Sequence, residues 1–321
     1  MGMSSVVPAG WRTRVLDWFG SPRVLRELAL ASVVANVVIV VTGGAVRLTG
    51  SGLGCPTWPR CTGSSLTPTR AHSFHGVIEF TNRQLTFVLG LIAVLTLLAA
   101  YRQRRELGLA LLAFLGIPAQ AVMGGITVLT DLNPWTVAAH FLLSMSIIAV
   151  TTVLWWRLRS SSGSGFGPAV LLARLIVLAA VVVLALGTVV TGTGPHAGDK
   201  GARHRIALDP SGVAQLHADA VWVLVGLTVG LVVLLRVTRA SRSVQRAGWW
   251  LLGIELSQGV IGYIQYFTHV PSGLVAVHML GACLVWVAAL RVLLTVQPTD
   301  RSVAPVVADG SPLGAPRPRS P

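Results

Sequence analysis

Long apolar stretches alternate with short polar connections along this chain, and the pattern predicts a membrane protein built from helices. Eight stretches are nearly free of charged side chains and have the roughly 20 residues that a helix needs to cross a hydrocarbon core. They cover approximately residues 27–47, 77–100, 108–130, 135–156, 172–193, 213–235, 248–267 and 272–295. No small-residue cleavage motif follows the first stretch, so we interpret it as a retained span rather than a signal peptide.

Composition supports the same fold class, an all-α polytopic membrane protein. The chain is 53% hydrophobic and 11% charged, whereas soluble domains are about 25% charged. Its formal net charge is +14, and most basic residues fall before the first span or after the second, fourth, sixth and eighth. The positive-inside rule then places both termini in the cytoplasm. We assign the charge to topology and to contact with anionic lipid, and we expect no nucleic-acid partner.

The spans divide into two halves that repeat. At a constant offset of 138, residues of the third and fourth spans match residues of the seventh and eighth: Gln120 with Gln258, Gly124 with Gly262, and His140 with His278. We therefore expect two tandem four-helix bundles in the same orientation. The expected segments are a cytoplasmic N-terminal segment (1–23), an N-terminal bundle (24–159), a flexible linker (160–171), a C-terminal bundle (172–296) and a disordered cytoplasmic tail (297–321).

Two histidines of the second half lie inside predicted spans, where ionisable groups are costly and usually functional. His217 lies near the start of the sixth span and His278 near the start of the eighth. Two neutral imidazoles facing each other across a bundle suit the axial positions of a haem iron. Hydrogen bonding between helices is the alternative interpretation.

The first half carries a modified version of this pattern. His140 corresponds to His278, but Asn82 stands where the partner His217 would be. Because an amide is a poor iron ligand, we expect a haem there to be held loosely, as a substrate would be. Glu79 lies one turn before Asn82 and is a candidate base or charge stabiliser.

Two further groups lie close to this acid in the sequence. Arg83 can pair with Glu79, contact a haem propionate, or snorkel to the interface. His75, four residues before Glu79, is a candidate substitute ligand or proton relay, or a plain interfacial histidine.

Cys55 and Cys61 bracket "PTWPR" in the first loop on the non-cytoplasmic side. A disulfide is expected if that side is oxidising, with two free thiols, or a metal-binding pair lacking other ligands, as the alternative. The pair would either clamp the loop as a lid or act in redox chemistry near Glu79.

These residues resemble one known family, the haem A synthases of bacterial respiratory membranes, which are related to the mitochondrial enzyme. The resemblance covers about residues 24–296 and is carried by "GGAVRLTGSGLGCPTWPRC", "IEFTNR", "AAHF", "QLHAD" and "VAVHML". It implies an oxidoreductase of a bacterial plasma membrane that converts haem O to haem A, by successive hydroxylations of the C8 methyl to a formyl group.

The resemblance also implies roles for particular residues. His217 and His278 would hold a haem b cofactor, His140 would bind the iron of haem O, and Glu79 would be the essential acid. Cys55 and Cys61 would match the loop cysteine pair of the family. Two departures stand out: Asn82 replaces a histidine common in the family, and the second cysteine pair of some members is absent.

The implied partners are the farnesyl-adding haem O synthase and an aa3-type oxidase, and a homo-oligomer is open. The alternative function is a non-catalytic bis-His cytochrome b that exchanges electrons with quinone, which would leave Glu79 and the cysteines without a role. A transporter fits less well, because transporters often use inverted repeats with sites near the midplane, whereas this repeat is parallel.

Overall fold

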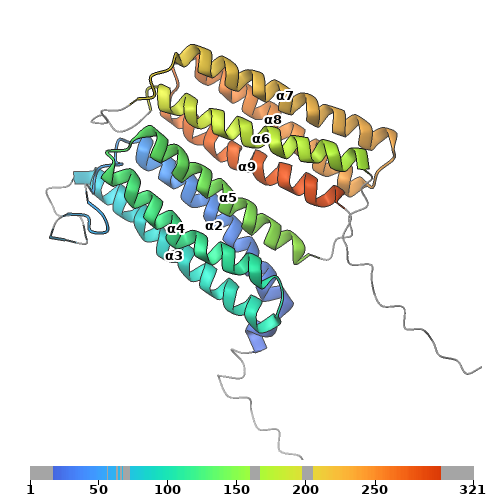
Figure 1. Cartoon of the computed structure of the whole chain (residues 1–321), viewed down its shortest axis with the longest axis horizontal. Coiled ribbons are helices and arrows are strands. Elements are labelled where there is room, and N and C mark those ends of the chain that lie inside the picture. The colour runs from blue at the N-terminus through green and yellow to red at the C-terminus, as the bar shows by residue number, and fades with distance from the viewer. Residues whose placement is uncertain are drawn as a thin grey trace, which may run out of the picture.

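The computed structural model describes residues 17–55, 57–62, 64, 65, 67, 73–159, 167–196 and 205–297. Within these ranges, eight long helices make up most of the chain and no strand occurs (Figure 1). They are α2 (Pro22–Leu48), α3 (Ser73–Gln103), α4 (Leu107–Leu129), α5 (Pro134–Arg157), α6 (Gly167–Thr193), α7 (Pro210–Val237), α8 (Arg242–Phe267) and α9 (Ser272–Val296). Most of the expected N-terminal segment, residues 160–166 of the expected linker and nearly all of the expected tail lie outside the described residues.

Each expected span lies within one of these helices, to within one residue at a single boundary. Among the described residues, seven helices are long and apolar enough to cross a membrane, and α8 is the exception. The sequence of α8 mixes Glu255, glutamines and serines with its apolar residues. The prediction of an all-helical, multi-pass membrane protein is confirmed, while the eighth span stays a prediction.

Proline and capping side chains set several helix starts. Pro134 and Pro210 occupy the first turns of α5 and α7, where proline loses no helical hydrogen bond. The Asn133 side chain accepts from the Trp135 N–H, and the Asp209 side chain accepts from the Gly212 N–H. Helix α6 begins at Gly167, inside the range expected for the linker, because Pro168 fits a first helical turn.

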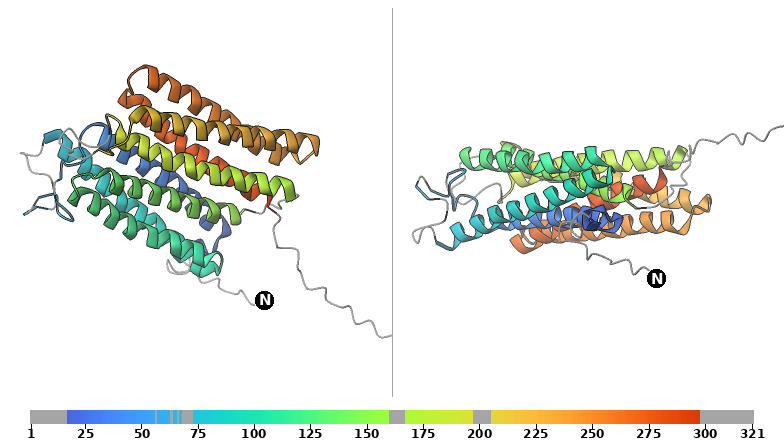
Figure 2. Two further views of the ribbon diagram at one scale, coloured as in Figure 1. Left: turned by 45° about the horizontal axis from the view of Figure 1, so that its top comes forward. Right: turned by 90° about the horizontal axis from the view of Figure 1, so that it is seen from below.

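The helices pack in two groups of four (Figures 1 and 2). In the first group α2, α3, α4 and α5 each contact the next, and α5 closes on α2. In the second group α6, α7, α8 and α9 form the same closed ring. Helices α3 and α5 are therefore diagonal partners, as are α7 and α9, and each pair faces across its own group. The same orientation of the two halves stays a prediction.

The two groups share a hydrophobic core. Helix α9 packs against α2 and α5, and α5 also contacts α6. Val40, Met145 and Ile148 of the first group belong to the same buried cluster as Leu184 and Trp286 of the second. The Trp286 indole N–H donates to the Met145 carbonyl at 2.8 Å, which joins the halves by a buried hydrogen bond.

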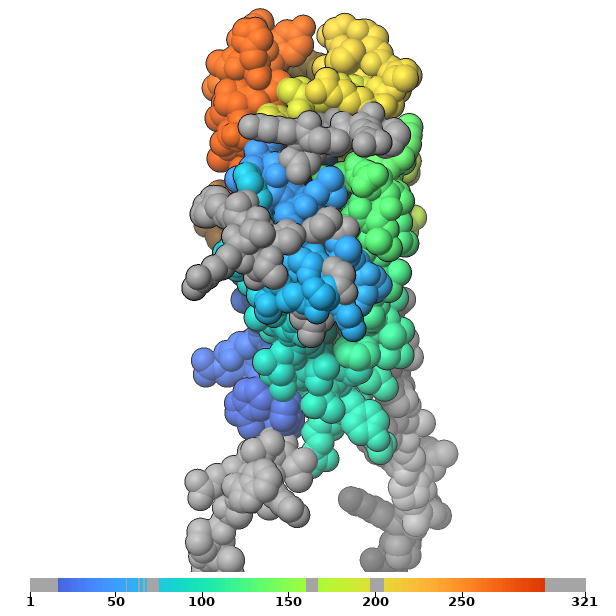
Figure 3. All heavy atoms as spheres, turned by 90° about the vertical axis from the view of Figure 1, so that its left-hand side faces the viewer, coloured from blue at the N-terminus to red at the C-terminus, as the bar shows by residue number. Residues whose placement is uncertain are grey.

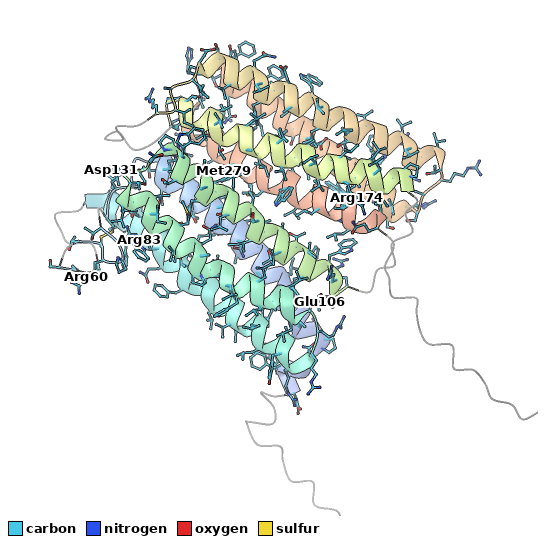
Figure 4. All side chains as sticks on the ribbon, viewed as in Figure 1. Arg60, Arg83, Glu106, Asp131, Arg174 and Met279 are labelled. Carbon is cyan, nitrogen blue, oxygen red and sulfur yellow. A yellow bond between two sulfur atoms is a disulfide. The ribbon has the colours of Figure 1, made fainter. Side chains whose placement is uncertain are left out.

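The loop between α2 and α3 defines one end of the molecule, which we call the loop end. Helices α3, α5, α7 and α9 all start there (Figure 1). In Figure 4, Arg83, Asp131 and Met279 lie toward this end, whereas Glu106 and Arg174 lie toward the opposite one. Figure 3 looks onto the loop end and shows blue atoms of the loop covering the tips of the first group.

Candidate functional site

Glu79 and Arg83 form an ion pair one turn apart on α3. An Arg83 Nη2 hydrogen is donated to Glu79 Oε1 at 2.5 Å, and the Glu79 side chain is only 7% exposed. The second carboxylate oxygen, Oε2, accepts the Cys55 backbone N–H at 2.7 Å. Of the interpretations open for Arg83, the structure therefore shows the pairing with Glu79.

Arg83 also binds the backbone of the loop. Its Nη2 donates to the Cys55 carbonyl at 3.0 Å and its Nη1 to the Thr57 carbonyl at 3.1 Å. The planar guanidinium offers five N–H donors in a fixed fork, and here they bridge a carboxylate and three carbonyls, the third being that of Arg60 at 3.5 Å from Nη1. Glu79 and Arg83 thus fasten the loop to α3.

Cys55 and Cys61 are joined by a disulfide, as expected from the sequence, and both are fully buried. Between them in the sequence, Trp58 packs its ring so closely against α4 that a Cβ added at Gly125 would lie 2.5 Å from Trp58 Cδ2. Only a residue without a side chain leaves this space. The disulfide therefore closes the loop on itself, the Glu79–Arg83 pair fastens it to α3, and the Trp58 ring packs it against α4.

Asn82 and His75 make contacts to the α2 side of the group. The Thr42 hydroxyl donates to Asn82 Oδ1 at 2.8 Å, and a Cβ added at Gly43 would lie 3.7 Å from Asn82 Nδ2. His75 is exposed, and its Nδ1 lies 2.9 Å from the Ser51 hydroxyl. A role for His75 as a ligand or relay stays a prediction.

His140 lies in the second turn of α5, on the helix diagonal to that of Asn82. Its Nδ1 is buried and has no hydrogen-bond partner among the described residues. A Cβ added at Gly124 on α4 would lie 3.3 Å from its Cε1. The Gln120 amide steadies this turn, donating to the His140 carbonyl at 3.3 Å and the Ser144 hydroxyl at 2.5 Å.

His217 and His278 repeat this arrangement on the diagonal helices α7 and α9. Each lies in the second or third turn from the loop end. Within the described ranges, the Nδ1 of each is buried and unpaired, although the His217 ring also approaches the Val183 backbone. A glycine lies beside each ring. A Cβ added at Gly187 would lie 3.3 Å from His217 Cε1, and a Cβ added at Gly262 would lie 3.8 Å from His278 Cε1.

This donor set fits a haem in the second group. Two buried imidazoles from opposed helices supply two nitrogen ligands of the kind that haem iron takes. The glycines leave backbone surface beside both rings. The first group offers one such imidazole, and the Asn82 oxygen opposite is already engaged by Thr42.

Two charged residues that the sequence did not single out carry buried polar atoms. In the described part of the chain, Arg47 near the end of α2 has buried Nε and Nη2 atoms without a partner. Glu255 of α8 is 2% exposed; its Oε1 accepts from the Thr228 hydroxyl at 2.9 Å, and its Oε2 has no partner within the described residues. An acid inside a predicted span was the available signal for Glu255. Arg47 gave little signal, because an arginine at a span end usually faces the interface.

Comparison with known proteins places these residues in a family. The model of the COX15-CtaA family, described as cytochrome oxidase assembly protein, matches residues 26–290. The chain is similar to proteins named heme A synthase from three bacteria. With that of Exiguobacterium sibiricum it shares 32% identity over 46% of this chain and 52% of the relative. With that of Bacillus mycoides it shares 30%, over 41% and 45%. With that of Geobacillus thermodenitrificans it shares 32%, over 38% and 39%.

The chain thus spans about half the length, or less, of the curated relatives it matches. The family match is broader, since it runs from the first turns of α2 to the last turns of α9 and includes every histidine, acid and cysteine described above. This chain belongs to the COX15-CtaA family of cytochrome oxidase assembly proteins.

Proposed function

We propose that this protein is a haem A synthase, an oxidoreductase that converts the C8 methyl of haem O to a formyl group by successive hydroxylations. The observation that carries the proposal is the inequality of the two histidine sites. Two opposed imidazoles stand in the second group, whereas His140 stands opposite Asn82 in the first. A pair of sites of which one holds a permanent haem and the other an exchangeable haem suits the modification of a haem. The relatives named heme A synthase support this assignment.

In the second group, His217 and His278 would hold haem b through their imidazole nitrogens. Haem b supplies one-electron transfer when bound. Both histidines lie in the second or third turn of a long helix, so the separation of their imidazoles is set by helix packing rather than by a loop. The shared core around Trp286 and Met145 packs this group directly against the first.

In the first group, His140 would bind the iron of haem O, and Asn82 would leave the opposite face weakly held. A weak second ligand favours exchange, because the substrate must enter and the product must leave. Gly124 allows the His140 imidazole to approach α4 closely. His75 lies near the start of α3, where its Nδ1 contacts the buried Ser51 hydroxyl that follows α2, and it would line the entrance on the loop side.

Glu79 would act as the base, or would stabilise positive charge that develops at the oxidised methyl carbon. Its two oxygens accept from Arg83 and from the Cys55 N–H, so its orientation is set before substrate binds. Arg83 is then a positioning residue that holds the acid and the disulfide loop together. The loop would act as the lid of the first group. A redox role for Cys55 and Cys61 near Glu79 is the alternative.

We place the protein in the bacterial plasma membrane with both termini in the cytoplasm. The farnesyl-adding haem O synthase would deliver its substrate, and an aa3-type oxidase would receive haem A.

Identification of bound pigments tests the proposal. The purified protein should carry haem b together with haem O or haem A. His217→Ala should lose haem b, and His140→Ala should keep haem b and lose the other two pigments. If wild-type protein from cells that make haem O carries haem b alone and forms no haem A, the chain is a bis-His cytochrome instead.

A further inference from the structure

Arg47 lies on the buried face of α2. Residues of this helix that face the protein recur at helical spacing and include Ala29, Asn36 and Val40, all nearly inaccessible. Arg47 follows Val40 by seven residues and therefore continues the same stripe. Leu30, Val34 and Val38 are exposed and mark the opposite face. The guanidinium thus extends into the protein, away from the face that would meet lipid.

The neighbours of this stripe place Arg47 between the two halves. At about 100° per residue, its side chain leaves the helix about 40° from Gly43 and about 60° from Gly44. Gly43 faces Asn82, and a Cβ at Gly44 would overlap the Met279 side chain, which adjoins His278. Arg47 therefore projects between the Asn82 side of the first group and α9, one turn closer to the loop end.

No group in the described part of the chain accepts a hydrogen bond from Nε or Nη2 of Arg47. Because buried, unpaired guanidinium nitrogens are costly, such a residue normally has an anionic partner. The carbonyls at the C-terminal end of α2 favour a cation there, but they leave these two buried N–H groups unsatisfied. Arg83 does not compete for the same partner, since it already binds Glu79 and the loop carbonyls.

We infer that Arg47 binds a propionate carboxylate of the haem that enters the first group of helices, and so orients the substrate ring against His140. The inference rests on the proposed function. A guanidinium and a carboxylate form a charge-assisted, two-point contact, which fixes the direction of a ring as well as its affinity. A lipid phosphate could supply similar chemistry, but it would have to reach the face of α2 that is turned away from lipid.

The test uses full-length protein, purified with its resident haem, in phosphatidylcholine nanodiscs. It is titrated with haem O and with haem O whose propionates are methyl esters. Wild type should bind haem O about tenfold or more tightly than the diester. Arg47→Gln should bind both forms with the affinity of the diester, because the charge-assisted contact is lost. Arg47→Lys keeps the charge without the fork and should be intermediate.

Arg26→Gln is the matched control, since it removes the same charge from an exposed position near the other end of α2. It should retain the wild-type preference. The spectrum of the resident haem reports whether each variant is folded. If Arg47→Gln does not fold, the comparison with wild type is made with Arg47→Lys.

Three results would overturn the inference. Equal binding of the two haem forms by wild type would exclude a propionate contact, and full preference in Arg47→Gln would exclude this arginine. If phosphatidylglycerol co-purifies with wild type before reconstitution but not with Arg47→Gln, and haem preference is unchanged, the site is assigned to lipid. If wild type binds neither form beside its resident haem, the proposed function itself fails.

Discussion

Glu79 and Cys55 are joined directly: the backbone N–H of Cys55 donates to Glu79 Oε2 at 2.7 Å, while Arg83 binds both the same carboxylate and the Cys55 carbonyl. The proposed catalytic acid and the disulfide loop therefore form one unit. Reduction of the Cys55–Cys61 bond would free the segment that supplies this N–H donor. The orientation of the acid and the closure of the loop are thus coupled by two hydrogen bonds, and a change at either should be felt at the other.

Glu79→Gln should retain haem but lose activity. The amide still offers an oxygen to the Cys55 N–H, so the loop stays attached, but the negative charge is gone. We expect haem A formation to fall by roughly 100-fold, the range of one acid–base group, with the resident haem spectrum unchanged. Pigment analysis of membranes measures both. Glu27→Gln, at an exposed ion pair with Arg23, should form haem A normally; normal formation in Glu79→Gln would remove the acid from the mechanism.

Gly125→Ala should lift Trp58 from its position on α4. The added methyl cannot share the space of the ring, so either the loop shifts or the helices separate. Overpacking of this kind costs about 1–3 kcal/mol, and we expect a lower melting temperature and faster reduction of the disulfide. Thermal denaturation and thiol alkylation after mild reduction measure these effects.

Gly90→Ala provides the matched comparison, because a Cβ at Gly90 on α3 would meet nothing within 4 Å. Alanine favours a helix over glycine by roughly 1 kcal/mol, so this variant should be as stable as wild type or more so. Equal behaviour of the Gly125 and Gly90 variants would contradict the packing assigned to Trp58.

Thr228→Val should destabilise the protein more than Glu255→Gln does. Thr228 supplies the hydrogen bond to Glu255 within the described residues, and valine would leave both carboxyl oxygens without a donor. The expected loss is about 1–3 kcal/mol, the cost of an unsatisfied buried polar group. Glutamine keeps an acceptor for the Thr228 hydroxyl and should be close to neutral. Melting temperatures of the two variants decide, and the reverse order would argue that Glu255 is held by something other than Thr228.

The cap of α7 should respond to acid. The Ser211 hydroxyl and then the Gly212 N–H lower the pKa of Asp209 from its ordinary value. A lowered pKa means that the stabilisation is complete above the ordinary carboxyl pKa of about 3.9 and is lost as the pH falls through the lower, folded value. Asp209→Asn keeps an acceptor that does not titrate. The difference in melting temperature between wild type and this variant should change below about pH 4, and a constant difference would exclude the effect.

Much of the fold could be read directly from the order of residues. The eight apolar stretches coincide with α2 to α9, because in a bilayer every backbone N–H and C=O must be satisfied within its own helix. Length and hydropathy are therefore nearly sufficient to locate the helices. The boundaries at Pro134 and Pro210 are equally local, since proline and an N-cap side chain act within one turn.

The candidate site was only partly accessible in this way. A repeated histidine at matching depth, an acid followed by an arginine one turn later, and a closely spaced cysteine pair were visible in the sequence and led to the expected disulfide. The sequence did not show which partner Arg83 binds, because the backbone of residues 55–60 must first fold onto α3 to offer it acceptors. The burial of Arg47 and the Glu255–Thr228 contact likewise depend on which helix faces which.

The sequence alone thus determined where the helices run and which side chains could bind a haem iron, since both follow from local composition and spacing. Only the tertiary structure decided which polar groups are already satisfied by neighbours and which remain buried without a partner. The physical reason is that hydrogen bonding at these positions joins residues from different helices, up to 141 positions apart for Trp286 and Met145, and helix rotation and packing alone fix those pairings.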